Sequence, residues 1–462
     1  MKKDTLKTQS PFELDSSLSK QKNPSSKKAL VFGGGGSKGA YQIGAYEALC
    51  EEGFEFDLVV GVSIGAINGA MIAQGDFAKA KELWLNLTLE DVIDKGLNLT
   101  FDMDYYFDNT QKILPFLKTY TQNKGMDITP LQNTIAAYID YNKLANSPID
   151  FGLLCLEVPS FNPCEKQKAQ MDENSLLHWL LASASCFPAF PIYEIAGQKY
   201  IDGGYYDNLP IDLAFKMGAS DIVAISLNPD CETKYDKNPL VQHLRPSHYL
   251  GTMLDFTPNN IKRNMRIGYL DMKRALSYYC GKYFAFYTMS AAESSMLESI
   301  AKKLLCFLLT KELDTNTTPP TLSSLLSDQM ARTGILSKIT SSTPFCDKLL
   351  ILATQHNHQK PTLQDIGIAL LEGFMEVFCY DDLKVWKVND VLDSATNALH
   401  LSHDNLLTSQ NTPTNLNPQH LQDLQEILTS LKTHKPNATL LEKTPELMWC
   451  ALLALSLSMA NM

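Results

Sequence analysis

Residues 56–69 read FDLVVGVSIGAING, and the rest of the chain is organised around this stretch. A short apolar run is followed by Gly61-Val62-Ser63-Ile64-Gly65 and then by small residues that suit a helix. This order predicts a strand, a sharp turn and a helix, an arrangement in which the turn exposes a serine oxygen above a sheet. Gly61 and Gly65 fit this turn because a side chain at either position would collide with the neighbouring strand or helix. The helix after Ser63 would also direct its positive end toward any oxyanion that forms there.

A second glycine-rich turn lies upstream of this stretch. Residues 29–32 (ALVF) predict a short buried strand, residues 33–39 read GGGGSKG, and residues 40–49 predict a helix. A glycine turn between a strand and a helix can form a cradle of backbone amides for negative charge. The two predicted strands would be adjacent and parallel in one right-handed βαβ unit, so both turns should open at the same edge of the sheet.

The upstream turn could also be interpreted as one of two nucleotide-binding motifs. Gly34, Gly36 and Gly39 satisfy Gly-x-Gly-x-x-Gly, but a dinucleotide site also needs an acidic residue at the end of the second strand. That strand ends in residues 61–65 instead. A phosphate-binding P-loop needs Ser or Thr after its lysine, whereas Lys38 is followed by Gly39. We therefore expect the cradle to serve an oxyanion beside Ser63.

The rest of the N-terminal part alternates strands and helices. Asp202-Gly203-Gly204 follows a predicted hairpin that turns at Gly197; an acid there can approach another backbone, although a plain turn aspartate is the simpler interpretation. Residues 105–107 and 114–117 are apolar and aromatic clusters that could line an acyl pocket or pack in the core. The other predicted elements are a strand at 149–158, a helix at 176–184, hairpin strands at 192–195 and 199–201, and a strand at 221–227.

The histidines argue against a serine, acid and histidine triad. Ser63 lies on about the second strand, which is too early for an α/β-hydrolase. His178, His243 and His248 follow it, but none lies in a turn marked by glycine or aspartate. We therefore expect no histidine in the site, and the sequence shows no pattern of metal ligands.

Three motifs in the order 34–39, 61–65 and 202–204 resemble the bacterial patatin-like phospholipases. The resemblance covers about residues 28–290. One departure is Lys38, where the family commonly has arginine; the charge is kept, but the planar fork for bidentate contacts is lost. Further segments are similar to bacterial members, namely residues 182–191, 208–210 and 264–271.

The resemblance implies a Ser–Asp dyad without cofactor or metal. Ser63 would attack the acyl carbonyl of a lipid ester, Asp202 would accept its proton, and the amides of Gly35 and Gly36 would hold the oxyanion. The implied function is hydrolysis of fatty-acyl esters of glycerophospholipids or lysophospholipids. A soluble carboxylesterase with the same dyad is the alternative, whereas a non-catalytic relative would normally have lost part of the site. The other motif residues are Gly34, Ser37, Lys38, Gly39, Gly61, Gly65, Gly203 and Gly204.

Composition and patterning suggest the domain organisation. The chain has 462 residues and a net charge of −11, which argues against a general nucleic-acid binder. We predict a disordered tail at 1–27, a three-layer α/β domain with a mainly parallel sheet at 28–290, and an all-helical accessory domain at 291–462. We see no secretory signal and no membrane span, so we expect a cytoplasmic protein with transient membrane contact. Export without a cleavable signal and the oligomeric state stay open.

Overall fold

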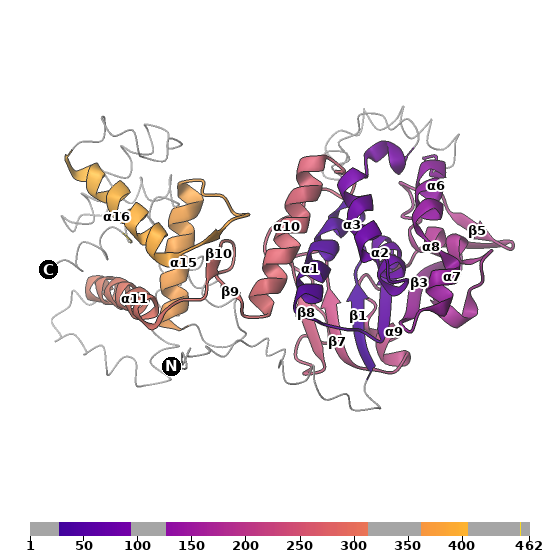
Figure 1. Cartoon of the computed structure of the whole chain (residues 1–462), viewed down its shortest axis with the longest axis horizontal. Helices are drawn as coiled ribbons and strands as arrows, with labels where there is room; N and C mark the ends of the chain where they lie inside the picture. Colours follow the sequence, from indigo (N-terminus) through magenta and orange to yellow (C-terminus); the bar gives the residue numbers. More distant parts are fainter. Residues whose placement is uncertain (1–26, 94–125, 313–361, 405–452, 454–462) are drawn as a thin grey trace. The chain divides into compact units, whose positions relative to one another are not determined.

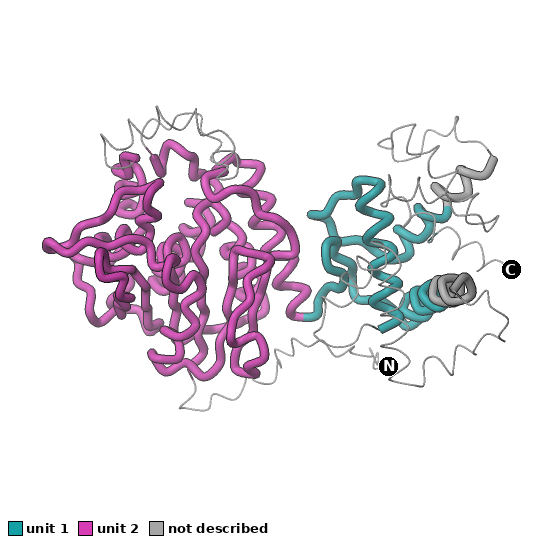
Figure 2. The backbone as a smooth tube through the Cα atoms, turned by 180° about the vertical axis from the view of Figure 1, so that it is seen from behind, with its two compact units in different colours: residues 1–11, 277–462 teal, residues 12–276 magenta. Residues whose placement is uncertain are grey.

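The computed structural model describes residues 27–93, 126–312, 362–404 and Leu453 of the chain. It divides into two compact units, of which one is 12–276 and the other combines 1–11 with 277–462 (Figure 2). Residues 1–26 of the tail predicted at 1–27, and the clusters at 105–107 and 114–117, lie outside the described residues, whereas Lys27 is the first residue of a strand. The domain boundaries at 27/28 and 290/291 stay a prediction.

The first unit alternates strands and helices along the chain, and Figure 1 labels most of them. Between 27 and 93 the elements are β1 (Lys27–Phe32), the short 3₁₀ helix η2 (Gly36–Gly39), α1 (Ala40–Glu51), β2 (Leu58–Val62), α2 (Ile64–Ala73), α3 (Phe77–Asn86) and η3 (Leu89–Asp91). From 126 to 205 they are α6 (Thr129–Tyr138), α7 (Tyr141–Asn146), β3 (Asp150–Val158), β4 (Pro163–Gln167), η4 (Lys168–Gln170), α8 (Leu176–Ser183), β5 (Tyr193–Ile195), β6 (Gln198–Asp202) and η5 (Gly203–Tyr205). The unit ends with α9 (Ile211–Lys216), β7 (Ala219–Ile225), β8 (Val241–Leu244) and α10 (Pro258–Ala275).

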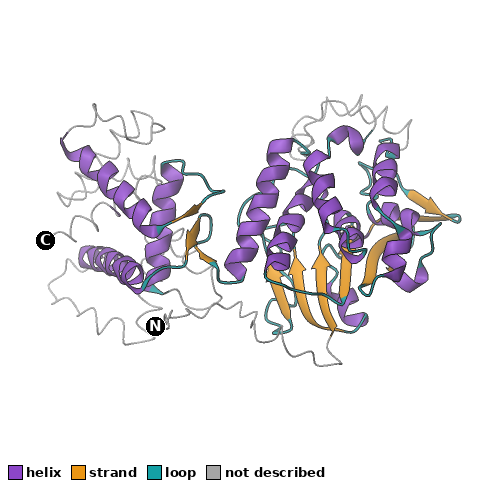
Figure 3. Cartoon of the chain, in the orientation of Figure 1, coloured by secondary structure: helices purple, strands orange, loops and turns teal. Residues whose placement is uncertain are grey.

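The described strands of this unit form one mainly parallel sheet in the order β5-β6-β3-β2-β1-β7-β8, and β4 pairs with β3 off this path. Strands β3, β2, β1, β7 and β8 are parallel, whereas β4 and β6 run antiparallel to β3. Figure 3 shows this sheet with helices around it. The prediction that the first two strands are parallel neighbours is confirmed, so both glycine turns open at one edge of the sheet.

The residues of the central strands alternate between two helical layers. Ala29 and Val31 of β1 belong to a buried cluster with Leu213 and Ala214 of α9. On β2, Val59 faces the other way, since a Cβ on Gly69 of α2 would lie 3.1 Å from its Cγ1 atom. Because side chains alternate across a strand, the sheet is covered on both faces and the three-layer prediction is confirmed.

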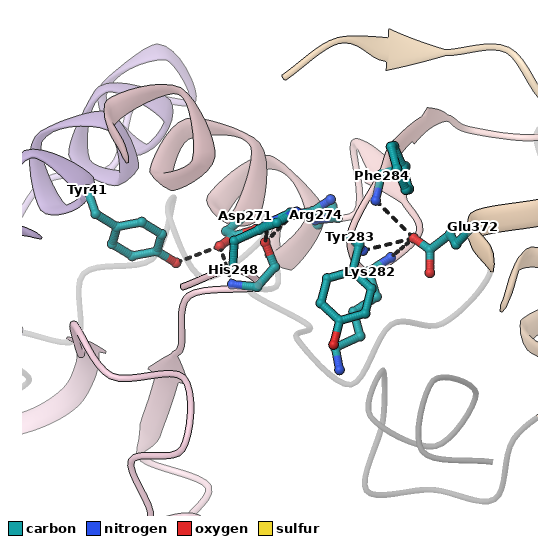
Figure 4. A network of polar contacts seen from close by, with 9 residues as sticks. Tyr41, His248, Asp271, Arg274, Lys282, Tyr283, Phe284 and Glu372 are labelled. Carbon is teal, nitrogen blue, oxygen red and sulfur yellow. Dashed lines mark hydrogen bonds and ion pairs between the residues drawn. The ribbon is translucent and has the colours of Figure 1, made fainter. Parts of the chain in front are cut away.

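Helix α10 packs very closely on α1. A Cβ on Gly44 of α1 would lie 1.8 Å from the carbonyl oxygen of Met265, and one on Gly268 of α10 would lie 2.0 Å from that of Tyr41. These two glycines therefore allow the helix backbones to approach one another. Asp271 of α10 accepts a hydrogen bond from the Tyr41 hydroxyl at 2.9 Å, which fixes the pair further (Figure 4).

The described part of the second unit is mostly helical. Helices α11 (Ala291–Glu312), α15 (Leu363–Val377) and α16 (Val388–Asp404) accompany a small sheet of β9 (Tyr279–Cys280), β10 (Ala285–Tyr287) and β11 (Val385–Trp386). The predicted all-helical character of 291–462 therefore has one exception, because β11 pairs with β10. This pairing provides hydrogen-bond partners for backbone groups at the edge of β10. The Trp386 indole N–H donates to the Asp381 carbonyl at 3.0 Å.

The predicted elements at 29–32, 40–49, 149–158, 176–184 and 221–227 are all present, and none of their ends is shifted by more than two residues. The hairpin also turns at Gly197 as predicted, with a positive φ of 81°.

Candidate active site

The two candidate catalytic residues meet along one edge of β3. Val62, the last residue of β2, pairs with Leu154, and Asp202, the last residue of β6, pairs with Cys155. Cys155 also pairs with Cys164 of β4, and a strand residue has one partner on each edge, so β6 continues along the edge that β2 occupies. Consecutive residues of a strand are about 3.3 Å apart, so the antiparallel β6 brings Asp202 to the end of β2, where Ser63 follows.

Ser63 occupies a strained turn between β2 and α2. Its φ of 56° and ψ of −131° are unusual for a residue with a side chain, and it is 7% exposed. A Cβ on Gly61 would lie 2.2 Å from the Gly65 carbonyl oxygen, and a Cβ on Gly65 would lie 2.4 Å from that of Phe32. The steric need for both glycines is therefore confirmed. Such strain persists only where the surroundings hold it in place.

Asp202 is buried next to Ser63 and is 4% exposed. Burial raises the pKa of its carboxyl to about 6, while hydrogen bonds from the Ser63 side chain and the Gly204 amide oppose this rise in pKa. The Gly204 amide donates to Oδ1 at 2.7 Å. Gly203 has no room for a side chain, because a Cβ there would lie 2.3 Å from the Leu154 carbonyl oxygen. The carboxylate is therefore more basic than an exposed aspartate and lies within reach of the serine proton.

The glycine-rich turn after β1 leaves two amides available. The amides of Gly34 and Ser37 donate to the carbonyls of Asn208 (3.2 Å) and Met253 (2.8 Å). In the described ranges, the amides of Gly35 and Gly36 donate to no protein acceptor. Gly36 has φ 59°, and a Cβ there would lie 2.2 Å from the Met253 carbonyl oxygen. This turn can therefore offer adjacent N–H groups to an anion, as the sequence predicts.

The turn reaches Ser63 directly. A Cβ on Gly34 would lie 2.9 Å from Cβ of Ser63, and a Cβ on Gly39 would lie 2.7 Å from Cγ1 of Ile64. The half-buried Lys38 has its Nζ 5.7 Å from the ring centroid of Tyr249, and burial lowers the pKa of its ammonium group. The Ser37 hydroxyl donates to the Thr252 carbonyl at 2.9 Å and anchors the turn to the segment before α10.

Sequence reasoning missed a buried polar network that supports the turn. The Gln42 amide donates to the Gly33 carbonyl at 2.7 Å, and Asn68 donates to Gln42 (2.9 Å) and to the Gly39 carbonyl (3.1 Å). The Trp84 indole donates to Asn68 at 2.8 Å. Gln42 and Asn68 are fully buried. Isolated amides among small and apolar helix residues were the only signal for this network in the sequence.

Asn208 also went unassigned, although the sequence marks its turn as similar to the family pattern. Besides accepting from the Gly34 amide, Asn208 donates from Nδ2 to the Gly34 carbonyl at 3.3 Å. A Cβ on Gly204 would lie 2.6 Å from its Oδ1 atom. Asn208 thus joins the glycine-rich turn to the turn that follows Asp202.

The three central histidines bond elsewhere. His178 contacts the Tyr193 hydroxyl at 2.7 Å, His243 contacts Asp236 at 3.2 Å, and His248 contacts Ser247 at 2.8 Å. Burial and the nearby Arg245 lower the pKa of His243 to about 4, against the opposing effect of Asp236. His243 is therefore neutral at physiological pH. No group of three or more His, Cys, Asp or Glu side chains suited to a metal ion occurs within the described ranges.

A serine on a glycine-flanked elbow, a buried acid and a cradle of free amides together define the architecture of a serine hydrolase site. Residues 30–215 match the family model described as patatin-like phospholipase. This segment, 186 of the 462 residues, is therefore a patatin-like phospholipase domain.

Individual relatives match the same part of the chain. The human patatin-like phospholipase domain-containing protein 6 is 28% identical over 212 residues, which cover 44% of this chain and 14% of that protein. Lysophospholipase NTE1 of Scheffersomyces stipitis is 25% identical over 228 residues, covering 46% of this chain and 12% of that protein. The match thus spans about one seventh or less of the length of these relatives.

A solved structure, VipD from Legionella pneumophila, aligns with a TM-score of 0.38 at 13% identity and covers 94% of this chain and 92% of its own. A likeness of this size adds nothing to the assignment of the site. In the part of the chain that the structure describes, no helix combines the length and the apolar character needed to cross a bilayer.

Proposed function

We propose that the protein is a lipid acyl hydrolase that cleaves fatty-acyl esters of glycerophospholipids or lysophospholipids with a Ser63–Asp202 dyad. The observation that carries this proposal is the buried Asp202 hydrogen-bonded to Ser63, with a pKa raised to about 6. A carboxylate with this pKa is mostly ionised at neutral pH and is still basic enough to accept a proton from a nearby hydroxyl.

The reaction would proceed through an acyl-enzyme. The Ser63 proton passes to Asp202 while its oxygen bonds to the acyl carbon, which turns the carbonyl oxygen into an oxyanion. The collapse of this intermediate breaks the ester bond, and the leaving alcohol takes the proton from Asp202. Water then attacks the acyl-enzyme with Asp202 again as base, and this step releases the fatty acid and restores Ser63.

The free amides of Gly35 and Gly36 are suited to bind the oxyanion, together with the N-terminal end of α2. Removing one donor of this kind costs about 3–4 kcal/mol of transition-state stabilisation in other enzymes. The donors are held by the backbone geometry of the turn, so they need no rearrangement during the reaction. Gly34, Ser37, Lys38 and Gly39 would then shape the cradle without contacting the reacting carbon.

The substrate class rests on the family and on the relatives that are named phospholipases and lysophospholipases. Such substrates reside in membranes or micelles, so the proposal includes transient contact of the protein with a lipid surface. The proposal also includes a cytoplasmic location and treats residues 291–462 as an accessory domain.

Fatty-acid release from mixed phospholipid vesicles tests the proposal. Wild type should release fatty acid, and Ser63→Ala should not. Ser226→Ala is the matched control, because Ser226 is also buried and contacts neither Ser63 nor Asp202; its one hydroxyl proton lies between the carbonyl oxygens of Asn228 (3.2 Å) and Leu244 (3.4 Å). Fatty-acid release by Ser63→Ala at the wild-type rate would refute the assignment of Ser63 as the nucleophile. Hydrolysis of short-chain monomeric esters alone, without a rise on aggregated substrate, would identify a soluble carboxylesterase instead.

A further inference from the structure

One short segment at the end of α8 holds the backbone of both dyad residues. The Ser63 amide donates to Oγ of Ser183 at 3.0 Å, and the Asp202 amide donates to the carbonyl oxygen of Ser185 at 2.9 Å. Ser183 and Ser185 are both fully buried. Residues that are far apart in the sequence, at the ends of β2 and β6, thus share one anchor.

The Ser183 hydroxyl also connects this anchor to β3. It donates to the Leu154 carbonyl at 2.8 Å while it accepts from the Ser63 amide. Leu154 is the β3 residue that pairs with Val62, immediately before Ser63. A hydroxyl can donate once and accept at the same time, so one side chain satisfies two buried backbone groups.

The end of α8 is fixed independently of the dyad. The Ser185 hydroxyl donates back to the Leu181 carbonyl at 2.8 Å, one turn earlier in the helix. The Ser185 amide donates to the Ala182 carbonyl at 3.3 Å. The segment 183–185 is therefore a fixed support, and its contacts with Ser63 and Asp202 set where these two residues lie.

We propose that Ser183 is a positioning residue that holds the strained Ser63 turn at hydrogen-bonding distance from Asp202. This proposal rests on the proposed acyl hydrolase function. The Ser63 backbone conformation is costly and needs surrounding contacts to keep it in place. Without the Ser183 hydroxyl, the Ser63 amide and the Leu154 carbonyl lose their shared partner, and the serine can move away from the acid.

The test compares Ser183→Ala with Ser226→Ala, the control that removes a buried hydroxyl away from the dyad. Ser183→Ala should lower kcat by about 10- to 100-fold with little change in KM, because small misplacements of reacting groups have effects of this size. Ser226→Ala should keep the kcat of wild type. In Ser183→Cys the thiol is slightly larger than the hydroxyl and forms weaker hydrogen bonds, so this variant should give an intermediate kcat. It replaces Ser183→Ala in the test if the alanine variant does not fold.

The pH profile separates positioning from a loss of stability. The Ser63 hydrogen bond lowers the pKa of Asp202, so a longer contact in Ser183→Ala should move the acid limb of kcat/KM to higher pH. The thiols of Cys155 and Cys186 also face Asp202, and burial raises the pKa of both, so they stay neutral near pH 6. A loss of stability alone would lower the melting temperature and leave the limb in place.

Hydrogen exchange distinguishes failure of this proposal from failure of the proposed function. Faster exchange of the Ser63 amide in Ser183→Ala, but not in Ser226→Ala, is expected whether or not the protein hydrolyses lipids. An inactive wild type would overturn the proposed function. An unchanged exchange rate of the Ser63 amide in Ser183→Ala would overturn the claim that Ser183 holds the Ser63 backbone. If wild type is active, a Ser183→Ala enzyme with unchanged kcat and an unchanged acid limb overturns the positioning role.

Discussion

Two buried aspartates of the first unit show how different partners suit the same side chain to different tasks. Asp202 and Asp271 are each 4% exposed. Asp271 accepts from the Tyr41 hydroxyl and the Ser247 amide and forms an ion pair with Arg274 (Figure 4). Asp202 accepts from the Ser63 side chain and the Gly204 amide, which are both neutral donors.

The difference lies in the charge of the partners. An arginine is protonated at all relevant pH values, so Asp271 faces a full positive charge that offsets part of the cost of its burial. Asp202 has only neutral donors, and burial raises the pKa of its carboxyl to about 6. Equal burial therefore produces a structural anchor on α10 and a reactive base at the end of β6. The following substitutions test this contrast.

The largest effect is expected for Asp202→Asn. It should reduce ester hydrolysis by about 10²- to 10⁴-fold, the usual contribution of a general base. Stability should not fall with it. Raising the pKa of a carboxyl from 3.8 to about 6 is equivalent to about 3 kcal/mol, which the ionised Asp202 costs the folded protein above pH 6.

The pH dependence of unfolding checks the sign of this cost. The folded protein holds the Asp202 proton more tightly than the unfolded chain, so this group lowers stability as the pH rises from about 4 to about 6. Asp202→Asn lacks that contribution. Chemical denaturation at pH 4 and pH 7 should therefore show that the unfolding free energy of Asp202→Asn, relative to that of wild type, is higher at pH 7 than at pH 4. A variant that loses several kcal/mol at pH 7 would contradict the account of Asp202.

Asp271→Asn should show the opposite behaviour. Removing one partner of a buried ion pair leaves Arg274 without its charge partner and should cost about 3–5 kcal/mol of unfolding free energy. The folded fraction should keep a kcat near that of wild type, because Asp271 contacts neither Ser63 nor the glycine-rich turn. Denaturant titration and kinetics at low temperature measure the two quantities separately. Loss of kcat without loss of stability would abolish the distinction between the two aspartates.

The pH dependence of hydrolysis should reveal the raised pKa of the Asp202 carboxyl. Below about pH 6, kcat/KM should fall by about tenfold per pH unit as the base becomes protonated. Intrinsic fluorescence at each pH would show that the protein stays folded. A profile that is flat down to pH 5 would mean that no group with the pKa of Asp202 limits the reaction.

The smallest effect concerns a buried carboxylate of the second unit. Oε1 of Glu372 accepts from the amides of Tyr283 (2.9 Å) and Phe284 (3.1 Å) and also from that of Lys282 at 2.5 Å (Figure 4). Glu372→Gln keeps the shape but loses the charge, so it should lower the stability of this unit by about 1 kcal/mol. Limited proteolysis of the 277–312 region would detect the change, and hydrolysis by the folded protein should stay at the wild-type level. A variant as resistant to proteolysis as wild type would contradict the role of the charge.

The sequence predicts the fold and the two glycine-dependent turns well, because their signals are local. Gly61 and Gly65 indicate the tight turn at Ser63, because that turn has no room for side chains at these two positions. The turn at 33–39 is indicated by the short apolar strand before it. The order of these motifs leads to the family and, through it, to Asp202. The sequence cannot show that β6 continues the edge of β2 along β3, because strand register depends on contacts between distant segments.

The supporting residues are harder to read from the sequence. Ser183 and Asn208 act through backbone atoms of Ser63 and Gly34, and no residue pattern records such contacts. Gln42 and Asn68 are visible only as polar residues in otherwise small and apolar helices. The short strand β11 was missed because two residues carry no periodicity.

The most direct test of the dyad is labelling of the purified protein with a fluorophosphonate, followed by peptide mapping. We expect a covalent adduct on Ser63 in wild type at pH 8, and labelling of Asp202→Asn that is slower by at least about 10²-fold, since a missing general base slows the attack of serine. Labelling of Asp271→Asn should match wild type. An adduct on another residue, or equal rates for wild type and Asp202→Asn, would contradict the claim that Asp202 activates Ser63.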